Sequence, residues 1–95
     1  MASYIARVEL HQANADDYQT LHGSMERRGY SRTIKGSDGV IYMLPTGTYD
    51  AADASADLDQ AINAAKAAAA ETKKASSIIV SVRSAASWNG LVPRR

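Results

Sequence analysis

The sequence predicts an α+β fold in which two helices cover one face of a four-stranded antiparallel sheet. Alternation of apolar and polar residues near both ends of the chain indicates strands with one buried face. Apolar residues spaced three and four positions apart indicate two helices, and a glycine-bounded turn between them indicates a hairpin. The order of these segments, strand-helix-strand twice over, is typical of a split βαβ plait.

The first strand is predicted over residues 4–11, where every second residue is suited to a core. The core-facing residues would be Tyr4, Ala6, Val8 and Leu10, and the outward residues would be Ile5, Arg7, Glu9 and His11. Outward neighbours on a strand are separated by roughly 6.6–6.8 Å, which is two residue steps. The outward row thus places a guanidinium, a carboxylate and an imidazole side by side.

The first helix is predicted over residues 15–28. Asn14 can cap its start together with Asp17, and Gly29 stands where a left-handed residue would end it. Its core face is marked by apolar and aromatic residues at helical spacing, namely Tyr18, Leu21, His22 and Met25.

A hairpin is predicted to follow this helix. Residues 30–35 and 40–44 would form its two strands, and the turn 36–39 would connect them. Pro45 would end the second of these strands, because proline has no N–H to donate to a neighbouring strand.

The second helix is predicted over residues 55–74, where alanine dominates and Leu58 and Ile62 begin an apolar stripe. Ser55 or Asp53 could cap it. The last strand would follow over residues 77–84, which again alternate.

Together these elements predict a single ferredoxin-like domain, a βαββαβ plait over residues 1–90. The first and third strands would lie at the centre of the sheet, flanked by the fourth and the second. Residues 91–95 match the Leu-Val-Pro-Arg of a thrombin-cleavable tag, apart from the final Arg95, and are expected to lie outside the fold.

Composition excludes several classes of protein. The chain has 95 residues, a formal net charge of +1 and no cysteine, so disulfides, thiolate metal sites and a globally basic nucleic-acid surface are all excluded. No apolar run approaches the ~20 residues of a membrane span. We therefore expect a cytoplasmic protein with no membrane partner and no cofactor.

The open face of the predicted sheet carries the candidate chemistry. Glu9 or His11 could serve as a general base or acid, while Arg7 and Arg83 could bind a phosphate. These are the groups that metal-independent RNA cleavage needs, because the 2′-OH must lose a proton while negative charge develops on phosphorus. The alternative interpretation is a set of cross-strand ion pairs on a solvated face.

Apolar residues on the same face predict a second kind of function. They are Ile5, Ile41, Met43 and Ile79. Four apolar side chains on an otherwise wet surface indicate that something covers it, most simply a second copy of the chain. A homodimeric interaction module without catalytic activity is therefore the alternative to a ribonuclease.

A small basic cluster could add contacts to RNA. It comprises Arg27, Arg28, Arg32 and Lys35, around the end of the first helix and the second strand. A solvated helix end explains it equally well. His22 would pack against the sheet with a hydrogen-bond partner, and no third ligand accompanies Glu9 and His11, so no metal site is predicted.

Several residues resemble those of the GhoS-like antitoxin endoribonuclease family. Tyr4 and Glu9 lie on the first strand, Met25 precedes the aromatic Tyr30 by five residues, and Tyr30-Ser31-Arg32 follows a glycine. The resemblance covers most of the chain. It implies a ferredoxin-like fold, shared with small CRISPR-associated proteins, and an endoribonuclease that silences a toxin by cleaving the toxin's messenger RNA.

The resemblance also implies a role for His22. On a gapless alignment, the arginine that this family uses for cleavage falls at His22. A histidine can transfer protons but is not a permanently charged phosphate ligand. The segment 44–49 has no counterpart in this resemblance.

Overall fold

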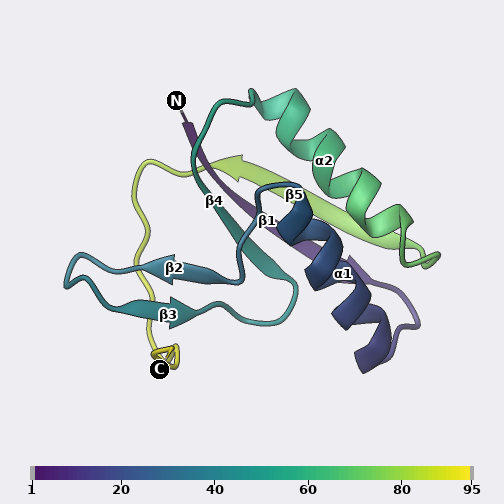
Figure 1. The fold of residues 1–95 in the computed structure, drawn as a ribbon, viewed down its shortest axis with the longest axis horizontal. Helices are drawn as coiled ribbons and strands as arrows, with labels where there is room; N and C mark the ends of the chain where they lie inside the picture. Colours follow the sequence, from purple (N-terminus) through teal and green to yellow (C-terminus); the bar gives the residue numbers. More distant parts are fainter. Residues whose placement is uncertain (1, 95) are drawn as a thin grey trace.

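The computed structural model describes residues 2–94. Its elements, in chain order, are β1 (Ala2–Leu10), α1 (Ala15–Arg27), β2 (Thr33–Lys35), β3 (Ile41–Met43), β4 (Thr48–Ala54), α2 (Leu58–Ala70) and β5 (Ser76–Val82). Both helices lie on the same face of the main sheet, and the β2–β3 hairpin projects from one side of it (Figure 1). The α+β class predicted from the sequence is confirmed.

The main sheet has three strands in the order β4-β1-β5, and β1 is antiparallel to both neighbours. Ala6 on β1 is paired with Tyr49 on β4 and with Val80 on β5. The prediction of a four-stranded sheet is wrong in this respect. The strand that pairs with β1 on this side is β4, and not the segment 40–44 expected from the sequence.

The hairpin forms a separate two-stranded sheet, in which Ile34 pairs with Tyr42. It meets the main sheet at one bridge. Ser31 and Asp50 exchange two backbone hydrogen bonds, with N–O distances of 2.7 and 2.8 Å. The predicted second strand, residues 30–35, therefore pairs with the main sheet only near its start, at Ser31, and then bends away.

β4 is the element that the sequence did not reveal. Its residues are Thr-Tyr-Asp-Ala-Ala-Asp-Ala, and aspartate and alanine are both depleted in strands. Tertiary packing overrides this weak propensity, since Tyr49 and Ala51 are buried beneath the helices. Gly47 introduces the strand at φ +86°, where a Cβ atom would lie 2.6 Å from the Val8 carbonyl oxygen, so only glycine fits.

The helices begin at residues that cap them in the same way. The Asn14 side-chain oxygen accepts from the Asp17 N–H, and the Asn14 N–H donates to the Asp17 carboxylate, as the sequence predicted. Gly29 follows the helix at φ +88°. α2 starts later than expected, because Asp57 and Gln60 form its capping box in place of Ser55 or Asp53.

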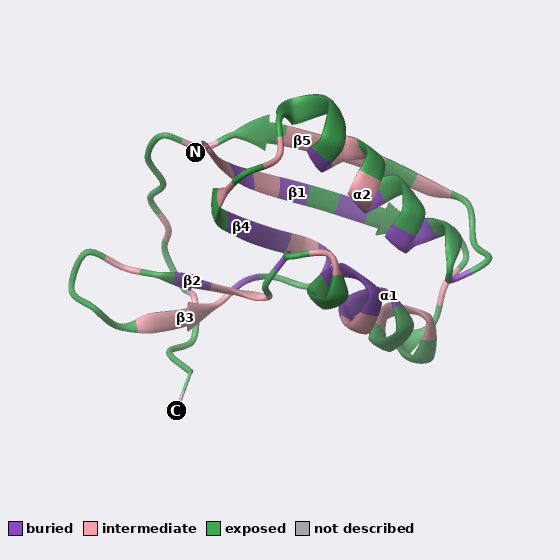
Figure 2. Ribbon diagram, turned by 45° about the horizontal axis from the view of Figure 1, so that its top comes forward, coloured by how far each residue is buried: buried purple, intermediate pink, exposed green. Residues whose placement is uncertain are grey.

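The core lies between the helices and the sheet (Figure 2). Its inward residues on β1 are the four predicted ones, Tyr4, Ala6, Val8 and Leu10. α2 contributes only small side chains, namely Ala61, Ala65, Ala68 and Ala69. A helix with an alanine face approaches its neighbours closely, which leaves little space for a larger side chain.

The C-terminal segment returns to the hairpin. The Met43 N–H donates to the Val92 carbonyl at 2.9 Å, and the Arg94 N–H donates to the Ile41 carbonyl at 2.7 Å. The segment set aside as a tag remnant therefore pairs with β3 up to Arg94, while Arg95 lies outside the described residues. Within residues 2–94, no helix has the length and apolar character needed to cross a membrane.

The close approach of α2 can be tested by enlarging one alanine. We expect Ala65→Leu to lower the free energy of unfolding by about 1–3 kcal/mol, because Ala65 is fully buried and the added atoms would overpack the core. Ala67→Leu, on the exposed side of the same helix, should change it by no more than about 0.5 kcal/mol. Urea denaturation measures both, and equal losses in the two variants would contradict the close packing.

Candidate functional site

The face of the sheet opposite the helices is open and carries the predicted row. Arg7 on β1 pairs with Ile79 on β5, and Glu9 pairs with Ser77. Because paired residues project to the same side of a sheet, these four side chains share the open face. All four are exposed.

The structure brings Glu9, His11 and Ser77 together at one end of this face. His11 Nε2 lies 2.9 Å from the Ser77 hydroxyl and 4.0 Å from Glu9 Oε1. Arg7, Glu9 and Ser77 also line one shallow hollow of about 270 Å³. Within residues 2–94 Arg7 forms no ion pair, so its guanidinium is available to an anionic ligand.

Arg83 is held away from this group by a partner that sequence reasoning missed. Its Nε and Nη2 atoms donate to the two carboxylate oxygens of Asp50 at 2.7 and 3.2 Å. Asp50 is only 6% exposed, and it lies on β4, the strand absent from the sequence prediction. Two parallel hydrogen bonds between one guanidinium and one carboxylate fix the arginine side chain in place. Arg83 is thus a positioned group and not a freely mobile one.

The predicted basic cluster is divided among three places, and its Lys35 lies on β2 beside the hairpin turn. Arg27 and Arg28 both bind Glu71 just beyond α2, at 2.9 and 2.6 Å. The hydrogen bond from Arg28 is the main cause that lowers the pKa of the Glu71 carboxyl. Arg32 lies elsewhere, beside Glu26 in an open hollow of about 590 Å³. These arginines therefore do not form one continuous phosphate-binding surface.

His22 lies on the helix side of the sheet, across from Glu9 and His11. Its Nδ1 atom is 2.6 Å from the Tyr49 hydroxyl, and both side chains are buried. Burial lowers the pKa of His22, Arg32 lowers it further, and Glu26 partly opposes this. Burial also raises the pKa of the Tyr49 hydroxyl, so the pair is a hydrogen bond between neutral groups.

The four apolar residues predicted as a dimer surface do not share one face. Ile79 projects from the main sheet and is 67% exposed, and Ile5 lies beside it, half-buried. Ile41 and Met43 belong to β3, in the separate hairpin, where both are half-buried. The prediction that they line the open face with Ile5 and Ile79 is wrong, because β4 occupies the position expected for their strand.

The described residues contain no cluster of three or more histidine, aspartate or glutamate side chains with the spacing of a metal site. What the open face offers is a carboxylate, an imidazole and a hydroxyl in mutual reach, with a guanidinium one step along the strand. These groups can exchange protons and bind an anion.

The burial of His22 predicts a pH dependence of stability. Because its pKa in the folded protein lies below the ordinary 6.5, the unfolded chain binds more protons as the pH falls through 6.5, and the free energy of unfolding should fall with it. His22→Gln can still hydrogen bond to Tyr49 but cannot titrate. Its stability, measured by urea denaturation between about pH 7.5 and 5.5, should fall less than that of the unmodified protein. Equal slopes would contradict this.

Comparison with known proteins adds no relative to this description. No protein-family model, no curated protein and no solved structure matches the chain.

Proposed function

We propose that this protein acts on RNA as a metal-independent endoribonuclease, and that Arg7, Glu9 and His11 on the open sheet face carry the reaction. The observation behind the proposal is the contact of His11 with Ser77 and Glu9, next to a guanidinium without an ion-pair partner in residues 2–94. Arg7 and Glu9 lie on β1, which is paired with β4 at Arg7 and with β5 at both residues. His11 follows directly after the strand, where its N–H donates to the Ala75 carbonyl at 2.8 Å.

In the proposed reaction the ribose 2′-oxygen attacks the adjacent phosphorus as its proton passes to the base. The bond from phosphorus to the 5′-oxygen breaks, and the acid donates a proton to that oxygen, so that a 2′,3′-cyclic phosphate and a 5′-hydroxyl result. Glu9 and His11 supply the base and the acid, and Arg7 balances the charge that develops on the phosphoryl oxygens.

The resemblance to the GhoS-like antitoxin family supports this proposal and names a substrate, the messenger RNA of a toxin. We interpret the fold as a ferredoxin-like plait whose third strand is β4. In this interpretation the Ser31–Asp50 bridge is what remains of the second strand in the main sheet. His22, which the resemblance aligns with an arginine of the family, acts here as a support for Tyr49 below the sheet.

The proposal predicts cleavage of a labelled single-stranded RNA by the purified protein in the presence of EDTA. Glu9→Gln and His11→Ala should each lower the rate by about 10²–10⁴-fold, the range expected for loss of a general acid or base. Asp59→Asn, which changes an exposed carboxylate on α2, serves as the matched control and should retain the rate. Gel electrophoresis of the products measures the outcome.

Cleavage that persists in both variants would remove this site from consideration. Activity that disappears on addition of EDTA would contradict the metal-independent mechanism.

A second candidate function, a homodimeric interaction module, is favoured by the outer edge of β5. In the described residues β5 pairs with β1 alone, and its sequence Ser-Ser-Ile-Ile-Val-Ser-Val contains no charge and no proline to protect that edge. Two copies of β5 could pair antiparallel across a two-fold axis. Ile79 and Ile5 would then lie next to the junction of the two sheets.

The dimer predicts that mass in solution depends on Ile79. Ile79→Glu should shift a dimer to a monomer, because an unpaired charge at a buried interface costs several kcal/mol. Thr20→Glu, on the exposed surface of α1, should leave the mass unchanged. Light scattering during size-exclusion chromatography measures it, and a monomeric unmodified protein would contradict the dimer.

A further inference from the structure

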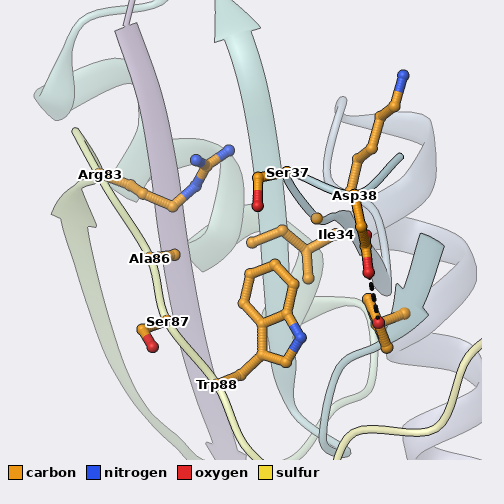
Figure 3. A pocket seen from close by; sticks show the side chains of 10 residues that line it. Ile34, Ser37, Asp38, Arg83, Ala86, Ser87 and Trp88 are labelled. Carbon is orange, nitrogen blue, oxygen red and sulfur yellow. Dashed lines mark hydrogen bonds between the residues drawn. The ribbon is translucent and has the colours of Figure 1, made fainter. Parts of the chain in front are cut away.

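Another hollow lies where the C-terminal segment passes the hairpin, and the reaction proposed above does not use it. Its volume is about 310 Å³, at the lower end of the range for ligand sites. Its lining includes Ile34, Lys35, Tyr42, Arg83, Ser87 and Trp88. Figure 3 shows the Trp88 indole reaching toward Ile34, with Arg83 earlier on the same C-terminal segment, just after β5.

The wall of this hollow is aromatic and is held in place by the hairpin turn. The rings of Trp88 and Tyr42 meet edge to face, with centroids 5.5 Å apart. The Tyr42 hydroxyl donates to Asp38 at 3.0 Å. A Cβ atom at Gly36 would lie 3.2 and 3.3 Å from the two rings and 2.7 Å from the Asp38 carboxylate, so the turn packs tightly against the aromatic pair.

Cationic groups stand at the rim. The Nε and Nη2 atoms of Arg83 donate to Asp50. The Nη1 atom of Arg83 has no hydrogen-bond partner in the part of the chain that the structure describes. The exposed Lys35 contributes a second positive charge from β2, and Ser87 contributes a hydroxyl. The hollow therefore combines an aromatic surface and a buried apolar side chain, Ile34, with two cations.

We infer that this hollow holds an unpaired nucleobase of a single-stranded RNA, with the adjoining phosphate on Arg83 and Lys35. Single-stranded RNA is recognised by stacking of its bases on aromatic side chains and by cations along its backbone. This inference rests on the proposed action on RNA and adds where the strand is anchored.

The position of Arg83 connects the hollow with the proposed reaction site. Arg83 follows β5 four residues after Ile79, the partner of Arg7, so the two sites are separated by roughly 13 Å along the strand. An RNA strand anchored by one base in the hollow can therefore lie across the open face and present a neighbouring phosphate to Arg7.

The chain provides its own probe, because Trp88 is the only tryptophan. The ligand for the test is a fluorescein-labelled, 2′-O-methyl oligoribonucleotide, which lacks the nucleophile and so reports binding without cleavage. Its addition should quench Trp88 emission in a saturable manner. The oligonucleotide concentration at half-maximal quenching should equal the concentration at half-maximal change in fluorescein anisotropy, which reports total binding. Adenosine and uridine monophosphates, tested separately, should quench at least tenfold more weakly than the oligonucleotide.

Two variants locate the site. Trp88→Leu should weaken binding by about tenfold in anisotropy, which corresponds to one stacked base. Ser87→Asp leaves the indole in place and adds a negative charge beside the expected phosphate, and it should weaken binding to a similar extent. Thr20→Asp adds the same charge to the exposed face of α1 and should bind as the unmodified protein does.

The outcomes separate this inference from the proposed catalysis. The oligonucleotide could bind without changing Trp88 emission and bind Ser87→Asp as tightly as the unmodified protein. That result would overturn the hollow as the anchor, while cleavage dependent on Glu9 and His11 could still stand. Quenching by mononucleotides as strong as by the oligonucleotide would assign the hollow to free nucleotides and overturn the RNA anchor. Absence of any oligonucleotide binding would overturn it as well.

Discussion

The pairing of β1 on both of its edges is the constraint on which the rest of the structure depends. Its inward residues, Tyr4 and Val8 among them, form the floor of the core, and its outward residues Arg7 and Glu9 belong to the proposed reaction site. Because alternate residues of a strand face opposite ways, a shift of one residue in its pairing would exchange the two sets. The same register therefore fixes both the stability and the chemistry of the molecule.

The sequence was most informative where local patterns and tertiary packing agree. The alternation in β1, the capping residues of α1 and the hairpin turn were all predicted, because each is set by neighbouring residues. β4 was not predicted, since its aspartates and alanines favour no strand and only the helices above Tyr49 and the pairing with β1 make it one. The error in the predicted main sheet follows from that single omission, because β4 takes the place beside β1 that the sequence assigned to the hairpin.

The same omission limited what could be said of the candidate site. Arg7, Glu9 and His11 could be placed on one face from the period of the strand alone. The ion pair of Arg83 with Asp50 is not foreseeable from local patterns, because it joins the end of β5 to β4, a strand that the sequence does not predict. Nor did any local signal bring Trp88 to the hairpin, which it reaches through pairing of the final residues with β3.

That pairing has a consequence for the order in which the molecule assembles. β3 donates a hydrogen bond to Val92 and accepts one from Arg94, about fifty residues further along the chain, so the hairpin completes its pairing only after β5 has led the chain back. Contacts between residues so distant in sequence form late, because closing a long loop costs entropy before any contact repays it. A protease that removed the last few residues would therefore expose the outer edge of β3, while β3 stays paired with β2 and the three-stranded sheet keeps its own pairing.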